Sequence, residues 1–169
     1  MTLLNILTYP DKFLKKQTVT VENIDGAMQT LFDKMATTMY AAPGVGLAAP
    51  QVGIGQSFII YDVAQQEEGR DLNILVNPKI VSSEGEIISQ NEGCLSVPDF
   101  RADVKRAERI LVEGADRDGS PLRFEADGLL AIVIQHELDH LNGTLFIDHI
   151  SALKRQMYKR RVKKEMKQQ

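Results

Sequence analysis

Two histidines four residues apart place the strongest constraint on this chain. His136 and His140 flank Glu137 in the sequence His-Glu-Leu-Asp-His. Residues four apart lie on one face of an α-helix, about 6 Å apart along its axis. Two imidazoles so placed can bind one metal ion, and Glu137 lies close enough to act on a water molecule there without being a ligand. The motif therefore predicts a helix with a metal site, and it favours a metal-dependent hydrolase over a pair of structural histidines.

Periodicity and turn signals predict the other elements. Apolar residues recur at spacings of three and four between Ile24 and Met39, which indicates an amphipathic helix. Strand-like runs are separated by turn residues, and Asp118-Gly119 joins two of them as a hairpin. Asp127 is the expected N-cap of the motif helix. The predicted helices are 25–40, 127–141 and 151–167, and the predicted strands are 57–62, 74–77, 79–82, 86–90, 108–116 and 120–125. This order gives an α+β class.

One segment is expected to lack regular structure. Residues 44–53, Gly-Val-Gly-Leu-Ala-Ala-Pro-Gln-Val-Gly, are too rich in glycine and proline to form a helix. We expect a loop whose backbone comes close to another group.

A catalytic metal site needs a third protein ligand, and the sequence offers three candidates. Asp148 and His149 lie downstream of the motif, but the eight residues between His140 and His149 do not match the metzincin spacing. Cys94, the only cysteine, lies upstream in Glu-Gly-Cys-Leu-Ser. A lone cysteine is usually a small buried hydrophobic residue, but a thiolate is also a strong ligand for a borderline-soft divalent metal. Cys94 is the strongest candidate, and with the two histidines it would leave one position open.

Composition limits the class of protein. The 169 residues are 43% hydrophobic, which suits one domain with a real core. The N-terminus lacks the pattern of a signal peptide, and no apolar run approaches the ~20 residues that span a bilayer. We therefore expect a cytoplasmic protein that does not enter a membrane.

Charge is distributed unevenly along the chain. Residues 151–169 contain eight basic residues and one acidic residue, so they carry +7, whereas residues 1–150 carry −10. We expect residues 1–150 to form the catalytic domain and residues 151–169 to form a basic helical extension of it. Such a tail is either a solvated helix or a contact surface for an anionic partner.

Three segments together resemble the peptide deformylases. They are residues 44–51, 92–96 and 135–143, and they occur in the family's order. The histidine motif alone is moderately specific, whereas the three segments together are very specific. The resemblance extends from the N-terminus through Asp148 and is closest to the bacterial type with a C-terminal helix. It implies an α+β fold in which mixed or antiparallel sheets surround the motif helix.

The resemblance also implies an activity. A deformylase removes the formyl group from the N-terminal formyl-methionine of nascent polypeptides and releases formate. Cys94, His136 and His140 would then hold the metal, with water in the fourth position. Glu137 would accept the proton of this water and later deliver it to the leaving amine.

The remaining site residues also follow from the resemblance. The side-chain amide of Gln51 and the backbone N–H of Leu95 would donate hydrogen bonds to the developing oxyanion. Gly46 would contact the substrate backbone, and Arg101 corresponds to a position near the substrate-binding face. Gln90 departs from the family, in which a hydrophobic residue is more usual at this place on the pocket rim. The residues expected around the methionine side chain are Val45, Leu129, Ile132 and Val133.

The cofactor and partners are expected on two grounds. Ligand rules alone favour Zn²⁺, whereas the resemblance implies Fe²⁺ in the cell, with Zn²⁺, Ni²⁺ or Co²⁺ able to replace it. The resemblance also associates the C-terminal helix with the ribosome near its exit tunnel, and no contact with DNA is expected. Two alternatives remain. One is a zinc endopeptidase, and the other is a non-enzymatic protein, either a domain with a closed structural metal site or a degenerate family member that only binds formylated chains.

Overall fold

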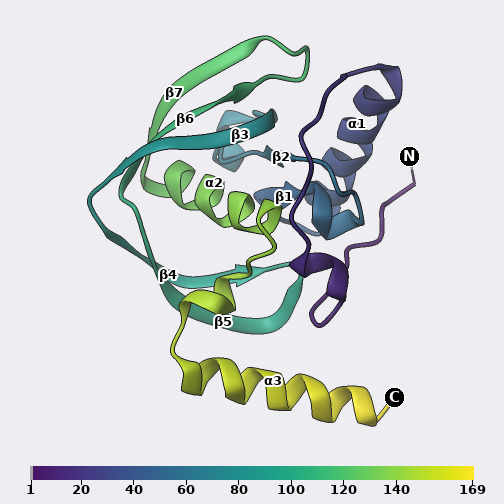
Figure 1. Ribbon diagram of the computed structural model, residues 1–169, viewed down its shortest axis with the longest axis vertical. Coiled ribbons are helices and arrows are strands. Elements are labelled where there is room, and N and C mark those ends of the chain that lie inside the picture. The colour runs from purple at the N-terminus through teal and green to yellow at the C-terminus, as the bar shows by residue number, and fades with distance from the viewer. Residues whose placement is uncertain (1) are drawn as a thin grey trace.

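A central helix with β-strands on both sides organises the molecule (Figure 1). The structure is a computed structural model that describes residues 2–169. Five strands form one antiparallel sheet in the order β1-β2-β3-β6-β7, and β4 and β5 form a separate antiparallel pair. The strands are β1 (Gly46–Ala48), β2 (Phe58–Tyr61), β3 (Asn73–Glu84), β4 (Ile87–Cys94), β5 (Val97–Arg106), β6 (Arg109–Ala115) and β7 (Pro121–Asp127). The helices are α1 (Gly26–Ala41), α2 (Gly128–Leu141) and α3 (Ala152–Lys167). The expected α+β class is confirmed.

Helix α1 covers one end of the five-stranded sheet. It begins where the Asp25 carboxylate accepts a hydrogen bond from Met28 N at 2.9 Å, as expected of an N-cap. Phe32, Met35 and Met39 on its apolar face are fully buried. Phe32 meets Phe58 of β2 edge to face, with ring centroids 5.1 Å apart. The spacing that predicted the helix is therefore the spacing of its core contacts.

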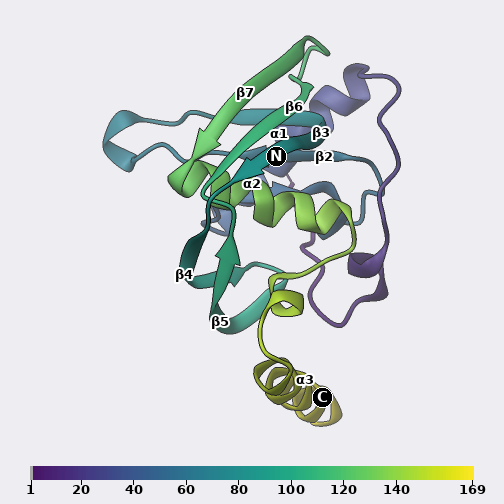
Figure 2. The same ribbon diagram turned by 60° about the vertical axis from the view of Figure 1, so that its left-hand side comes forward.

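Helix α2 lies between the two sheets (Figure 2). Ala131 and Ile134 are fully buried in a core cluster that includes Ile59 of β2 and Val112 of β6. His136, two residues further on, contacts β4 instead. Asp127 holds the expected N-cap position, but its side chain makes no hydrogen bond to the helix. Asp127 ends β7 and is paired there with Arg109, so its extended backbone belongs to the sheet.

Two predictions of local structure are wrong. Residues 44–53 are not irregular, because Gly46–Ala48 pairs with β2 and Ala49–Val52 forms a 3-10 turn. The expected strands 74–77 and 79–82 are one strand, β3, with a register shift between Val76 and Lys79. Pro78 lacks an N–H to donate, and Asn77 adopts a left-handed φ of 50°, so the ladder is distorted there but continues.

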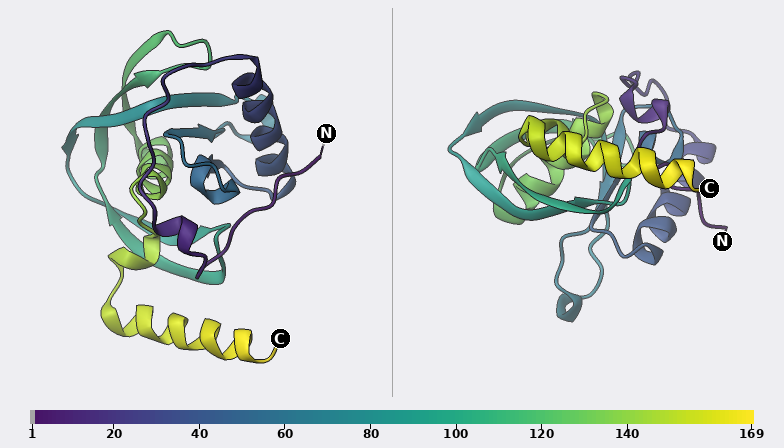
Figure 3. Two further views of the ribbon diagram at one scale, coloured as in Figure 1. Left: turned by 45° about the vertical axis from the view of Figure 1, so that its right-hand side comes forward. Right: turned by 90° about the horizontal axis from the view of Figure 1, so that it is seen from below.

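Helix α3 lies outside the rest of the fold and joins it along one side (Figure 3). Tyr158 is its buried residue, and it belongs to a cluster with Phe100 of β5 and Phe146 of the 3-10 turn Phe146–His149. The other turns of the helix are mostly exposed. Within residues 2–169, none of the helices has the length and hydropathy needed to cross a membrane.

Candidate active site

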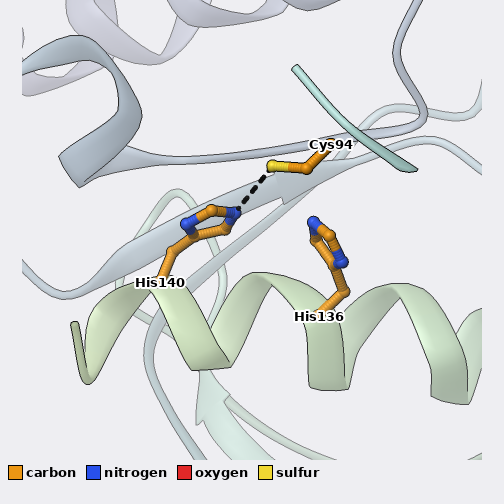
Figure 4. A group of neighbouring side chains, drawn as sticks. All are labelled: Cys94, His136 and His140. Carbon is orange, nitrogen blue, oxygen red and sulfur yellow. Dashed lines mark hydrogen bonds between the residues drawn. The ribbon is translucent and has the colours of Figure 1, made fainter. Parts of the chain in front are cut away.

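Cys94, His136 and His140 converge on one point between β4 and α2 (Figure 4). Their ligand atoms all lie within 4.8 Å of one another, and Cys94 Sγ is 3.4 Å from His140 Nε2. Within residues 2–169, no other group of three His, Cys, Asp or Glu side chains has this geometry. Cys94 ends β4, whereas the two histidines lie one helical turn apart on α2, so the site requires both elements.

The other candidate ligands lie elsewhere. His149 Nε2 is 2.9 Å from Asp139 Oδ2, and Asp148 Oδ2 accepts a hydrogen bond from Leu145 N at 2.9 Å. Neither residue belongs to the converging group. Of the three candidates, the structure brings Cys94 to the histidine pair.

A buried carboxylate orients His136. Glu92 Oε1 lies 2.6 Å from His136 Nδ1, and Arg106 donates two hydrogen bonds to the same carboxylate. Burial raises the pKa of Glu92, but its hydrogen bonds with His136 and Arg106 outweigh burial and lower it to about 2. Glu92 is therefore ionised at neutral pH and accepts the Nδ1–H of His136. Because Glu92 occupies Nδ1, Nε2 is the nitrogen of His136 that would face a metal ion. Burial lowers the pKa of His136, but its hydrogen bonds with Cys94 and Glu92 outweigh burial and raise it well above the ordinary 6.5, so a metal ion must displace a proton from His136 when it binds.

Sequence reasoning assigned no role to this orienting network. Arg106 also donates to Asp139 Oδ2 at 2.7 Å, so it joins β4, β5 and α2. Glu92 stands two residues before Cys94 on the same strand, a spacing that could have suggested a shared face. Arg106 carries no such signal, because its partners meet only when β4 pairs with β5.

Glu137 is placed as an isolated carboxyl group beside the convergence point. Its side chain is buried, and Oε2 has no hydrogen-bond partner among the described residues. Burial raises the pKa of Glu137 to about 7. The backbone of Gly46 packs so closely that a Cβ added there would stand 2.7 Å from Glu137 Oε1. A carboxyl group with a pKa near neutrality is suited to accept and return a proton.

The amide of Gln51 faces the same point in a fixed orientation. Its Oε1 accepts a hydrogen bond from Ala48 N at 2.9 Å, so its Nε2 is directed the other way. Nε2 donates to Ser96 Oγ at 3.0 Å and lies 3.6 Å from Cys94 Sγ. The 3-10 turn at Ala49–Val52 therefore aims a hydrogen-bond donor at the site.

A cavity of about 820 Å³ opens above these groups. This volume is large enough for one side chain of a short peptide and the backbone next to it. Every residue expected at the substrate lines it, although Val45 and Leu129 are also about half exposed. The lining includes Val45, Gly46, Gln51, Leu95, Leu129, Ile132, Val133 and Glu137, together with the polar side chains of Gln90 and Arg101.

Comparison with known proteins identifies the family. The model of the family described as polypeptide deformylase matches residues 3–156. The chain belongs to this family. It is 55% identical to the peptide deformylase of Desulfosudis oleivorans, over 99% of this chain and 97% of the other. It is 50% identical to the peptide deformylase of Thermodesulfovibrio yellowstonii, over 96% and 98% of the two chains.

Solved deformylase structures share the whole fold. A peptide deformylase from Legionella pneumophila superposes with a TM-score of 0.90 at 44% identity, covering 98% of this chain and 96% of the other. One from Ehrlichia chaffeensis, solved in complex with actinonin, gives 0.91 at 39% identity and covers 98% of both chains. The chain is thus a deformylase, a hydrolase that acts on the formylated N-termini of nascent peptides. The endopeptidase alternative finds no support.

The residues at the convergence point fit the metal of a deformylase. One thiol and two imidazoles are a donor set that divalent transition metals bind well. Burial, together with nearby His136, lowers the pKa of His140 well below its ordinary value, so its imidazole is neutral at pH 7 and ready to coordinate. Deformylases are metalloenzymes, and this chain has a group able to hold the ion.

Proposed function

We propose that the deformylase reaction takes place where Cys94, His136 and His140 converge, with these three residues as the metal ligands. The observation that carries this proposal is the convergence of the three ligand atoms beside the buried carboxyl group of Glu137. A divalent ion bound there would polarise the formyl oxygen and lower the pKa of a water molecule from 15.7 toward about 7.

Glu137 is the general base and acid in this proposal. It accepts a proton from the attacking water and then donates it to the leaving amine nitrogen of methionine. A pKa of about 7 allows the carboxyl group to serve in both directions at neutral pH. Its tight packing against Gly46 limits the positions that the carboxyl group can take.

Gln51 and Leu95 stabilise the negative charge that develops on the formyl oxygen. Gln51 Nε2 is the side-chain donor, and its orientation is fixed before substrate arrives because Oε1 is held by Ala48 N. The backbone N–H of Leu95, next to Cys94, is the second donor. Donors that need no reorganisation during the reaction contribute most to the rate, and removing one costs about 3–4 kcal/mol.

The cavity above these groups receives the formyl-methionine. Gly46 contacts the substrate backbone, and Arg101 and Gln90 stand at the polar side of the cavity, where the peptide continues. This arrangement separates an apolar region for methionine from a polar region for the following residues. The methionine side chain lies among Val45, Leu129, Ile132 and Val133.

We further propose that Fe²⁺ is the metal in the cell and that Zn²⁺, Ni²⁺ or Co²⁺ can take its place. A site with one thiolate and two imidazoles accepts all four ions. Protein purified without oxygen should contain iron by elemental analysis. Exchange for Ni²⁺ should preserve activity after exposure to air.

Formate release tests the proposed reaction. Metal-loaded protein is incubated anaerobically with formyl-Met-Ala-Ser, and both formate and new amines are measured. We expect one formate per amine, and no cleavage of an unformylated peptide of the same sequence. Glu137→Gln should retain the metal and lose at least about a hundredfold in kcat. Full activity in this variant would show that another group moves the proton.

Residues 1–150 and 151–169 have separate tasks in this proposal. The first part carries the reaction, and the basic helix α3 contacts ribosomal RNA in the cytoplasm. Binding through lysine and arginine should weaken steeply as salt rises. Protein truncated after Ile150 should fail to sediment with ribosomes that retain the full chain at low salt. Equal sedimentation of both forms would exclude α3 as the contact.

A further inference from the structure

Asp99 adopts a backbone conformation that few non-glycine residues take, although aspartate is among those that do. Its φ is +59°, in the left-handed region, and it lies where the pairing of β4 with β5 shifts register. Such a conformation persists only when neighbouring groups hold it in place. Asp99, Phe100 and Arg101 all line the cavity above the metal ligands. The unusual backbone is therefore part of the wall that the substrate meets.

Helix α3 provides the group that holds this backbone. Arg161 Nη2 donates a hydrogen bond to the carbonyl oxygen of Asp99 at 2.8 Å. The same guanidinium lies 6.0 Å from the ring centre of Phe100 and 5.3 Å from that of Tyr158. A guanidinium over two aromatic rings is attracted to their faces, so the donor is steered toward the carbonyl.

The contact lies at the most firmly packed part of the helix. Tyr158 is 3% exposed, and its ring centre is 4.8 Å from that of Phe100 and 5.6 Å from that of Tyr9. Phe100 in turn stacks on Phe146 at 6.1 Å. One turn of α3 is thus anchored to the strand segment that forms the cavity wall, while most of the helix is exposed.

We propose that Arg161 is a positioning residue for substrate binding: it holds Asp99–Arg101 in the shape that receives the peptide beyond methionine. The inference rests on the proposed function of this cavity. Leu129, Ile132 and Val133 of α2 line the cavity, and Asp99–Arg101 of β5 line it as well. Since the proposed function gives the α2 residues to methionine, we assign the β5 wall to the residues that follow methionine. Arg161 stands outside the cavity and touches no reacting group. Its effect should therefore appear in KM for longer substrates rather than in kcat.

Steady-state kinetics of two variants test the proposal. Arg161→Ala removes the donor, together with its contacts to the rings of Phe100 and Tyr158 and its ion pair with Glu165. Arg160→Ala is the charge-matched control, because Arg160 lies on the same helix and makes no contact that the structure records within residues 2–169. Arg161→Ala should raise KM for formyl-Met-Ala-Ser about five- to tenfold, with kcat within about twofold of wild type. KM for formyl-methionine amide, which ends before the β5 wall, should stay within about twofold. Arg161→Lys, which keeps one donor, should recover part of the loss.

The outcomes separate this inference from the reaction itself. If wild type releases no formate, both proposals are wrong. If wild type is active and the two alanine variants have the same KM for the tripeptide, Arg161 has no positioning role. Equal losses for the amide and the tripeptide would also overturn the inference, because they would indicate a general disturbance of the fold.

A double variant, in which Arg161→Ala is added to Asp99→Gly, tests the role of the strained backbone. Glycine adopts positive φ without steric cost, so Asp99→Gly removes the strain that the Arg161 donor offsets and should make the wall less dependent on that donor. Adding Arg161→Ala to Asp99→Gly should change KM by about twofold or less. A full five- to tenfold rise in this background would show that Arg161 does not act through the conformation of Asp99.

Discussion

The missing side chain of Gly46 leaves space for the carboxyl group of Glu137, the proposed general base. Gly46 leaves room for Glu137 because no Cβ projects from it, and a Cβ there would lie 2.7 Å from Oε1 and 3.0 Å from Cγ of Glu137. Both distances are too short for ordinary contacts. The position of the proposed base is therefore set by the backbone of β1, a strand of three residues.

Gly46→Ala should displace the carboxyl group while leaving the fold intact. We expect kcat to fall about a hundredfold, because a shift of about 1 Å in a reacting group has an effect of this size. Gly55→Ala is a suitable control, since the nearest side-chain atom to its Cβ would be 3.8 Å away. Circular dichroism checks the fold of both variants, and wild-type kcat in Gly46→Ala would contradict the assigned role of this packing.

His149 makes stability depend on pH. Its hydrogen bond to Asp139 raises its pKa above the ordinary 6.5. A group with a raised folded pKa stabilises the protein fully below its unfolded pKa and loses this effect as pH rises through the folded value. Metal-free His149→Gln should thus be less stable than metal-free wild type below about pH 6, and nearly equal well above the folded pKa. The gap should be about 1 kcal/mol or less, because the side chain is 39% exposed.

Urea unfolding at several pH values measures this gap. Both proteins are compared without metal, so that proton competition for the metal ligands does not enter. A gap of the same size at low and high pH would mean that the charge on His149 contributes nothing.

At the scale of elements, one buried arginine joins three parts of the fold. Arg106 of β5 pairs with Glu92 of β4 and Asp139 of α2, and its side chain is 4% exposed. Arg106→Leu would leave the Glu92 carboxylate buried without its cationic partner. The free energy of unfolding should fall by about 3–5 kcal/mol, as when other buried pairs lose one member.

Denaturant titration checks this value, with Arg123→Ala as the comparison. Arg123 pairs with Glu113 on the surface, where its side chain is 60% exposed, and its loss should cost about 1 kcal/mol or less. If the two variants lose equal stability, the buried network does not join the elements as described.

The same arginine explains why one strand escaped prediction. The inward residues of β5 are Ala102, Val104 and Arg106, so the apolar alternation typical of a half-buried strand is broken by a charge at an inward position. The helices were predictable because their periodicity is uninterrupted. Strand β1 was missed for another reason, since its glycine-rich sequence becomes a strand only through pairing with β2.

The candidate site was more predictable than the sheets that support it. His136 and His140 are close in sequence, and helix geometry alone brings them together. Cys94 was a candidate ligand from its chemistry alone, and the resemblance strengthened it, whereas Gln51 could be proposed only through resemblance, because tertiary structure decides its position. Glu92 and Arg106 received no role, since nothing local in the sequence links a carboxylate and a guanidinium to a histidine 44 residues beyond Glu92.

At the scale of the whole molecule, buried apolar clusters stabilise the fold without any contribution from a metal ion. Three core clusters lie around α1, around α2 and beneath α3. Removing the metal with a chelator should therefore abolish formate release while leaving the far-ultraviolet circular dichroism unchanged. The melting temperature should fall only by the amount of stabilisation that the bound metal ion itself contributed, so the metal-free protein remains folded. Global unfolding on chelation would contradict this view, and adding metal back should restore activity.

The proposed metal ligands come from a strand and a helix that are distant in sequence, since His140 lies 46 positions after Cys94. A ribosome must release both segments, and the strand pair β4–β5 must dock on α2, before any three-ligand site exists. The complete three-ligand site consequently forms only when these elements have packed together. In a cell, the amount of folded chain and the fraction loaded with metal can therefore vary independently, and enzyme abundance alone does not set the deformylation capacity.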